Sequence, residues 1–183
     1  MRTNSRLLLW MLFFATFVTR SFAVLMEPVS IEELTKQSSL VLHGTVLSKA
    51  CQRDPQGRIY TKVELSVSEV WKGSLSAKRF TVVHGGGILG EKRAVVSGQV
   101  EYGIGEEVVA FLVLNQRGEG VTLGLMQGKF RVWKDTETGE VLAQNPFHGA
   151  ERTSDRVAKA GAPVSRSRLT LGELKRRVQE GSK

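Results

Sequence analysis

The stretch of this sequence best suited to chemistry is a histidine followed by three glycines, within TVVHGGGILG. Gly85, Gly87 and Gly90 match G-x-G-x-x-G, in which glycines let the backbone approach a dinucleotide pyrophosphate. His84 with Gly85, Gly86 and Gly87 also spells HGGG, the oxyanion-hole string of some lipases and esterases. The run could therefore be a cofactor loop, half of a hydrolase site, or a connection between strands.

The residues around the glycine run favour the third interpretation. A dinucleotide loop needs a helix directly after the glycines, but residues 91–98 form a β-branched stretch that ends in glycine. A hydrolase needs a nucleophile elbow G-x-S-x-G, and residues 73–77 (GSLSA) lack its last glycine. We therefore expect a strand connection with no catalytic residue and no cofactor. A hydrolase or metal-dependent enzyme centred on His84 stays as an alternative.

The histidines and the cysteine give no recognisable metal or redox motif. His43, His84 and His148 lie far apart, and no pair has the spacing typical of zinc ligands. Cys51 is the only cysteine, so it cannot form an internal disulfide, and no histidine lies near it in sequence to act as a base. We expect no metal site and a structurally dispensable Cys51.

The first twenty-three residues are typical of a secretory signal peptide. Arg2 and Arg6 precede an apolar stretch of twelve residues, 7–18, which is too short for a membrane-spanning helix. Small residues then stand three and one before a cleavage point after Ala23. We expect a secreted or periplasmic protein with no stable membrane anchor after cleavage.

Charge is distributed unevenly along the rest of the chain. Residues 24–147 carry equal numbers of basic and acidic side chains, whereas residues 148–183 are strongly basic. Because binding to phosphates needs concentrated positive charge, a neutral body argues against nucleic-acid binding. The composition divides the chain into a signal peptide (1–23), a β-barrel domain (24–147), a linker (148–169) and a basic C-terminal helix (170–183).

Alternation of apolar and polar residues dominates residues 40–143 and predicts a mainly β fold. One strand alternates with Val63, Leu65 and Val67 on its apolar face, and Val70 falls out of phase, which predicts a bulge near Ser68–Glu69. The segment 108–114 is apolar on both faces. Together with Val63, Leu65 and Val67, it is expected to face one barrel interior. The predicted strands are 40–47, 60–71, 79–83, 93–96, 108–114, 121–125, 129–133 and 140–143.

Two short helices flank these seven or eight strands, which suit a small barrel or a sandwich. Ser30 and Glu33 form a capping box that opens a helix ending near Gln37. Thr170 is placed to cap a last helix over residues 171–179.

Several short motifs together resemble the netrin-like module, which is shared with the tissue inhibitors of metalloproteinases. The similarity covers about residues 39–116 and extends to small uncharacterised bacterial exported proteins with the same motif order. The motifs are GTV at 44–46, YT at 60–61, VSEVWKG at 67–73, YGIGEEV at 102–108 and FL at 111–112.

The resemblance implies an OB-fold barrel. The inhibitors' mechanism does not carry over, because it implies an N-terminal cysteine and several disulfides, whereas this chain is expected to start at Val24 with a single cysteine.

Taken together, the sequence predicts an exported, non-enzymatic barrel that binds an extracytoplasmic protein, as a protein-binding or protease-associated module. The candidate site is the loop His84, Gly85, Gly86 and Gly87 at one barrel end, with residues 49–58 and 103–107 around it. A second alternative is binding of an anionic polymer or the envelope surface through the basic tail. Its cations are Arg166, Arg168, Lys175, Arg176 and Arg177.

Overall fold

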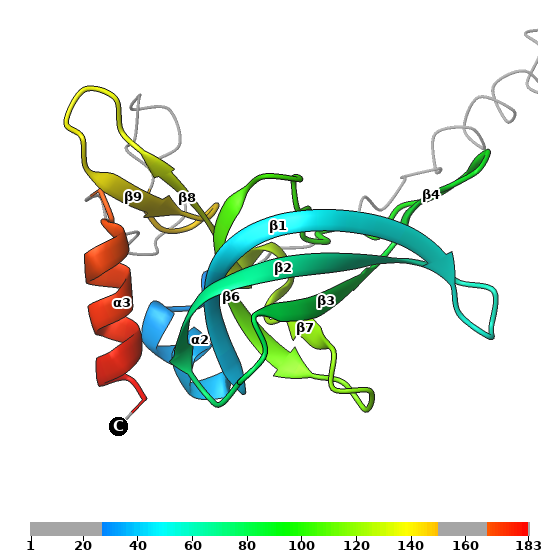
Figure 1. The fold of residues 1–183 in the computed structure, drawn as a ribbon, viewed down its shortest axis with the longest axis horizontal. Helices are drawn as coiled ribbons and strands as arrows, with labels where there is room; N and C mark the ends of the chain where they lie inside the picture. The colour runs from blue at the N-terminus through cyan, green and yellow to red at the C-terminus, as the bar shows by residue number, and fades with distance from the viewer. Residues whose placement is uncertain (1–26, 150–167, 183) are drawn as a thin grey trace, which may run out of the picture.

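The computed structural model describes residues 27–149 and 168–182. The predicted signal peptide and residues 150–167 of the predicted linker lie outside this range. The chain order is α2 (Ile31–Gln37), β1 (Leu40–Arg53), β2 (Ile59–Lys72), β3 (Arg79–Gly85), β4 (Gly87–Leu89), β5 (Lys92–Ala94), β6 (Glu107–Leu114), β7 (Gly120–Thr122), the 3-10 helix η1 (Leu125–Gly128), β8 (Lys129–Lys134), β9 (Val141–Gln144) and α3 (Leu171–Glu180). Figure 1 shows these elements.

Five of the strands form a barrel-like ring. The order of the large sheet is β1-β2-β3-β7-β6-β8-β9, and β1 also pairs with β6, so that β1, β2, β3, β7 and β6 return to β1. Strands β3 and β7 run parallel and share one residue pair, Val82 with Gly120, so the ring is not closed along that seam. Strands β8 and β9 extend the sheet beyond β6. The predicted mainly β, barrel-like fold is confirmed.

The predicted bulge in β2 is also confirmed. His43 of β1 lies opposite Glu69, but the next residue, Gly44, lies opposite Val67, which leaves Ser68 without a partner in the ladder. An extra residue reverses which side chains face inward. Val67 and Val70 therefore both pack against the barrel interior, although they are three residues apart.

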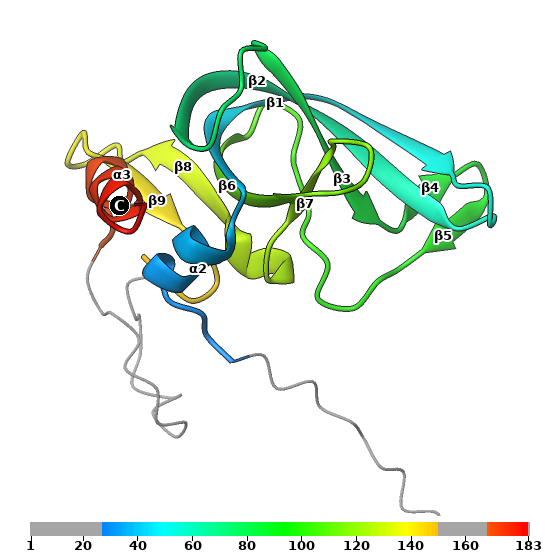
Figure 2. The same ribbon diagram turned by 90° about the horizontal axis from the view of Figure 1, so that it is seen from below.

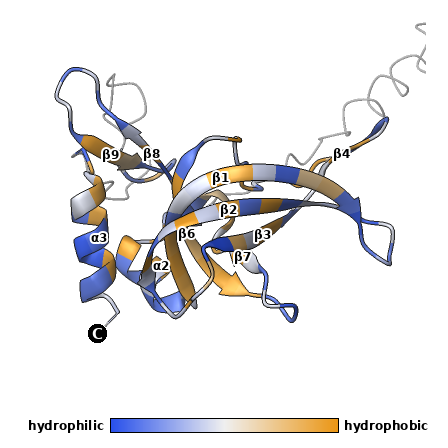
Figure 3. Ribbon diagram, in the orientation of Figure 1, coloured by the Kyte–Doolittle hydropathy of each residue, from blue (hydrophilic) through white to orange (hydrophobic). Residues whose placement is uncertain are grey.

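Two apolar clusters make up the core, one on each side of β6. Val108, Ala110 and Leu112 face the barrel interior, whereas Val109 and Phe111 face the helices. The prediction that the whole 108–114 run faces one interior was wrong, because alternate side chains of a strand point to opposite faces of the sheet. Figure 3 shows the resulting bands of hydrophobic and hydrophilic residues along β1 and β2.

Both helices begin where their capping residues predict. The Oγ of Ser30 accepts from the backbone N–H of Glu33 at 3.1 Å, and the Oγ1 of Thr170 accepts from Glu173 at the same distance. Leu174 and Val178 of α3 are fully buried, so this helix is part of the core. Figure 2 shows both helices at one end of the molecule and the β4–β5 hairpin at the other.

The described ends of the predicted linker pack onto the body. Leu169 is buried, and its carbonyl accepts from the backbone N–H of Ala143 at 2.8 Å. His148 Nε2 donates to the carbonyl of Val29 at 2.8 Å. Residues 148 and 169, the two ends of the predicted linker, are therefore part of the folded body. Over the described ranges, no helix combines the length and the apolar character that crossing a membrane demands.

Candidate functional site

The glycine run joins β3 to a projecting hairpin. Gly85 is the last residue of β3, Gly87 the first of β4, and β4 pairs antiparallel with β5. The glycines are thus followed by a two-stranded hairpin, so the G-x-G-x-x-G spacing lacks the helix N-terminus that would hold a pyrophosphate.

Two of the three consecutive glycine positions have a backbone conformation that only glycine adopts readily. Gly86 has φ +79° and Gly87 has φ +136°, which side-chain-bearing residues rarely adopt. A β-carbon on Gly87 would lie 2.6 Å from both Cys51 Sγ and Thr61 Oγ1. Gly85 differs: it is an ordinary strand residue, and its β-carbon would meet Val96 Cγ2 at 3.1 Å.

The surroundings of His84 fix its tautomer. Its Nδ1 lies 3.0 Å from the carbonyl oxygen of Gly85, which can only accept, so Nδ1 carries the proton and donates. Burial lowers the pKa of His84; the Gly85 hydrogen bond and the charge of Glu101 oppose that, and Lys49 adds to it. At neutral pH the ring is uncharged, with a lone pair on Nε2. That atom is buried and, among the described residues, has no hydrogen-bond partner.

The groups beside His84 do not form a nucleophilic or acid–base constellation. Its ring stacks on Tyr102, with the ring centroids 6.4 Å apart. Tyr102 is buried, its hydroxyl is 2.7 Å from Thr122 Oγ1, and burial raises its pKa, so that it stays protonated at neutral pH. Within the described part of the chain, the one hydrogen bond of the His84 side chain goes to a backbone carbonyl. Among the described residues, the His84 ring is therefore hydrogen-bonded to no serine, threonine or cysteine side chain.

Two hollows meet at the glycine run. The first, here called the hairpin hollow, has a volume of about 380 Å³ and is bounded by β1, β3 and the β4–β5 hairpin. The second, called the turn hollow, has about 750 Å³ and lies between the β1–β2 and β6–β7 turns. His84, Gly85 and Gly86 line both, so the run forms the wall between them.

The turn hollow has an aromatic and cationic rim. The guanidinium carbon of Arg117 lies 5.8 Å from the ring centroid of Tyr60. Arg117 also donates to Glu119 at 2.7 Å. The amide of Asn115, with Arg117 and Lys62, lowers the pKa of Glu119 to about 2, so this carboxylate is ionised and holds the β6–β7 turn against the rim.

Apolar side chains stand exposed on the hairpin side of the same end. Ile88 is 63% exposed, Val95 76% and Val96 45%, and Val96 lines both hollows. The half-buried Cys51 lies beneath the hairpin, with its sulfur 3.3 Å from Thr61 Oγ1. An apolar patch beside a large hollow marks a surface suited to binding.

The structure brings together only part of the loops expected around His84. The β1–β2 turn, within the expected segment 49–58, does line the turn hollow. The expected segment 103–107 instead borders a separate hollow with Lys129 and Arg131. The sequence interpretation missed Arg117 and the apolar hairpin residues, because sheet pairing alone brings them to this end.

The three histidines lie in separate environments. His43 Nε2 is 2.8 Å from Glu107 Oε1, and His148 stacks on Phe130 with centroids 6.0 Å apart. In the described ranges, no three His, Cys, Asp or Glu side chains are grouped closely enough to share a metal ion.

The basic side chains of α3 are engaged in ion pairs with the body or with their own helix. Arg177 binds Glu32 and Lys175 binds Glu69, at 2.7 and 2.6 Å. Arg176 is held between Glu173 and Glu180. Arg168 pairs with Asp135, and Arg166 lies outside the described residues. Each basic side chain of this helix therefore has a carboxylate partner among the described residues.

Comparisons with known proteins return no family: no protein-family model matches the chain, and no curated protein is significantly similar. Fold and site define the class directly: a mainly β, barrel-like protein with helices packed at one end and a hollowed apolar surface at the other.

Proposed function

We propose that this chain is an exported, non-enzymatic OB-like barrel that binds another protein at the end formed by the β1–β2 turn, the β6–β7 turn and the β4–β5 hairpin. The observation that carries the proposal is the exposed apolar trio Ile88, Val95 and Val96 beside the turn hollow.

The strand order supports the OB-like assignment. An OB fold is a five-stranded, partly open Greek-key barrel that binds ligands across its second and third strands and the loops beside them. Here a five-strand ring has one weak parallel seam, and the turn hollow lies against β2, β3 and the two turns. The netrin-like resemblance agrees with this assignment, and it remains part of the proposal.

The chemistry of the surface favours a protein partner. Protein interfaces are enriched in aromatic and arginine side chains around an apolar centre. The hollow combines Tyr60, Val96 and Val121 with guanidinium groups from Arg58 and Arg117. Of the three arginines that line the hollow, Arg58 and Arg117 pair with the carboxylates of Asp54 and Glu119, and Arg53 donates to the carbonyl of Gly57, which disfavours a phosphate polymer.

The state of His84 supports a binding function over catalysis. Its lone-pair nitrogen, Nε2, is buried and has no hydrogen-bond partner among the described residues, so it does not face a nucleophile or a substrate proton in this structure. A hydrolase centred on His84 would need a nucleophile at hydrogen-bond distance, and the described neighbours supply none.

Site-specific photo-crosslinking tests the proposal. A photoreactive amino acid replaces Val95 in the full chain, which is expressed in its native cells. The matched control carries the same amino acid at Val141, a 38% exposed valine on β9. The result expected is a discrete crosslinked partner from position 95 and none from 141. Equal crosslinking at both positions, or none at either, would contradict the assigned surface.

Export is checked separately by N-terminal sequencing of the extracytoplasmic protein, which should begin at Val24. A membrane-bound form that retains Met1 would contradict cleavage after Ala23.

A further inference from the structure

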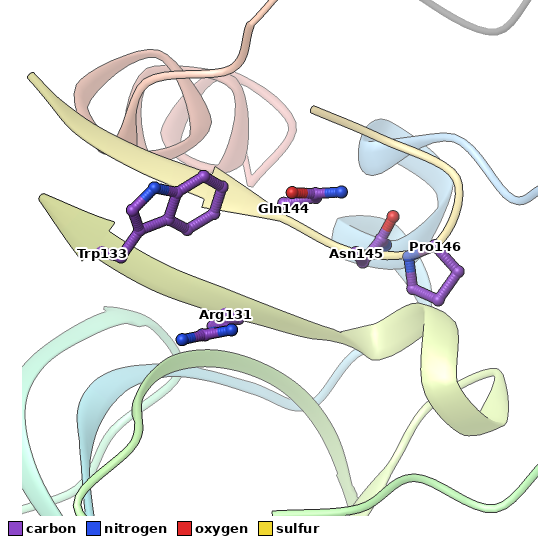
Figure 4. A pocket seen from close by; sticks show the side chains of 5 residues that line it. All are labelled: Arg131, Trp133, Gln144, Asn145 and Pro146. Atoms are coloured by element: carbon purple, nitrogen blue, oxygen red, sulfur yellow. The ribbon is translucent and has the colours of Figure 1, made fainter. Parts of the chain in front are cut away.

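Another hollow lies on a different face of the molecule, against the outer side of β8 and β9. It has a volume of about 440 Å³ and is lined by Arg131, Trp133, Gln144, Asn145 and Pro146. Figure 4 shows that two of these side chains come from β8, and the others from β9 and the segment after it. We call this the tryptophan hollow.

Strand register explains why these side chains share a face. Arg131 lies opposite Gln144 in the β8–β9 ladder, and Val132 lies opposite Ala143. Val132 and Ala143 are buried in the helix-side cluster. Because neighbouring side chains of a strand alternate, Arg131, Trp133 and Gln144 point away from that cluster. The indole of Trp133 is thus left outside the core, unlike that of the buried Trp71.

The hydrogen-bonding groups of the tryptophan hollow are available to a ligand. Among the described residues, the side chains of Arg131, Trp133 and Gln144 have no hydrogen bond or ion pair. Asn145 is different: its amide donates to the Gln127 carbonyl at 2.6 Å and its oxygen accepts from the backbone N–H of His148. Asn145 therefore holds the rim of the tryptophan hollow in place, and the side chains of Arg131, Trp133 and Gln144 remain able to bind a ligand.

This set of groups matches the surface of a sugar ring. A pyranose has one face of C–H groups, which packs on an aromatic ring, and an edge of hydroxyls, which needs both donors and acceptors. The indole supplies the apolar plane, the guanidinium a fork of donors, and the Gln144 amide one donor group and one acceptor. Arg131 and Trp133 are two residues apart on one strand, about 6.7 Å, which suits a single ring.

An adjoining hollow provides room for a second ring. Its volume is about 170 Å³, and it shares Arg131, Gln144 and Pro146 with the tryptophan hollow. It adds the carboxylate of Glu101, which can accept from hydroxyl groups. The charge of Arg131 is balanced by that of Glu101, and Lys129 is already paired with Glu106 at 2.7 Å. Such a lining suits a neutral or weakly acidic chain better than a polyanion.

We propose that the tryptophan hollow is an oligosaccharide-binding site in which Trp133 stacks on a sugar ring while Arg131 and Gln144 hold its hydroxyls. This inference goes beyond the proposed protein-binding surface, uses none of the residues that line the turn hollow, and is tested independently of that surface.

NMR titration with defined probes tests this site. Cellotetraose and chitotetraose are each added to the ¹⁵N-labelled secreted protein, or to the full chain if the leader is retained. The indole N–H resonance of Trp133 is assigned by its loss in Trp133→Phe. At least one tetrasaccharide should shift that resonance and leave the Trp71 indole unmoved.

Substitutions establish which groups bind. Trp133→Ala should weaken binding at least tenfold and Arg131→Ala at least threefold, measured by calorimetry with variants that melt like the parent. Lys134→Ala, a control on the same strand outside the hollow, should bind as the parent does. The proposal is overturned if no tetrasaccharide shifts Trp133, if binding survives both Trp133→Ala and Arg131→Ala, or if only a control peptide, acetyl-Asp-Glu-Asp-Glu, binds there.

Discussion

Replacing Gly87 with alanine should destabilise the protein far more than the same change at Gly90, three residues further on. Gly87 has φ +136°, and an added β-carbon would lie 2.6 Å from Cys51 Sγ and from Thr61 Oγ1. Gly90 has φ +61° and open space around its β-carbon. Both substitutions carry backbone strain, but only Gly87→Ala adds a collision with two packed side chains.

The structure sets the expected magnitudes. Alanine in the left-handed region costs about 1–2 kcal/mol, which is the expected loss for Gly90→Ala. At Gly87 a strained backbone of about 1–3 kcal/mol adds to overpacking of about 1–3 kcal/mol. Displacing Thr61 would also weaken its buried hydrogen bond to the Gly86 carbonyl, which is 2.8 Å long. We expect a total of about 3–5 kcal/mol, a large share of the typical 5–15.

Urea denaturation measures both free energies of unfolding, and a double mutant identifies the collision. Cys51→Ala removes the sulfur that the new methyl group would meet, so Gly87→Ala should cost less in that background. The reasoning is refuted if Gly87→Ala costs no more than Gly90→Ala. It is also refuted if removing the Cys51 sulfur leaves the cost of Gly87→Ala unchanged.

Three further predictions concern the core and two titrating groups. Leu65→Asp places an unpaired carboxylate in the barrel interior and should prevent accumulation of folded protein, whereas Leu47→Asp, at a 40% exposed site, should express and melt normally. The lowered pKa of Glu119 means that its stabilisation is complete above about pH 4.5 and is lost as the pH falls towards 2; Glu119→Gln should flatten this part of the acid-denaturation curve, and an unchanged curve would count against the rim ion pairs. For His84 the lowered pKa means that the folded state resists protonation, so stability should fall as the pH drops below about 6.5, and His84→Ala should remove that slope in melts from pH 5 to 8 without unfolding the protein at neutral pH.

Local interactions made several elements predictable. Each helix begins at a residue whose side chain accepts from the backbone N–H three residues ahead, as at Ser30 and Thr170. Because the two groups are so close along the chain, both helix starts can be predicted from local sequence. The bulge at Ser68 could be predicted from the sequence because an inserted residue shifts the phase of the apolar–polar alternation along the strand. The positive φ of Gly86 could likewise be expected, because glycine adopts positive φ without a steric cost.

Long-range pairing decided the sites. Tyr60 and Arg117 meet through sheet pairing across the ring, and no sequence period links them. The hollow at Trp133 depends on Arg131 lying opposite Gln144, a register that a shift of one residue would abolish.

The sequence by itself determined the positions of every strand except β4, although not their ends, together with the helix caps, the bulge and the need for glycine at residue 86, because each depends on neighbours along the chain. Only the tertiary structure decided which elements cover each face of β6, that α3 packs against the body through Leu174 and Val178, and that its cations are paired. Apolar patterning specifies which side chains seek burial, but the partner that covers them is chosen by how distant segments pack together.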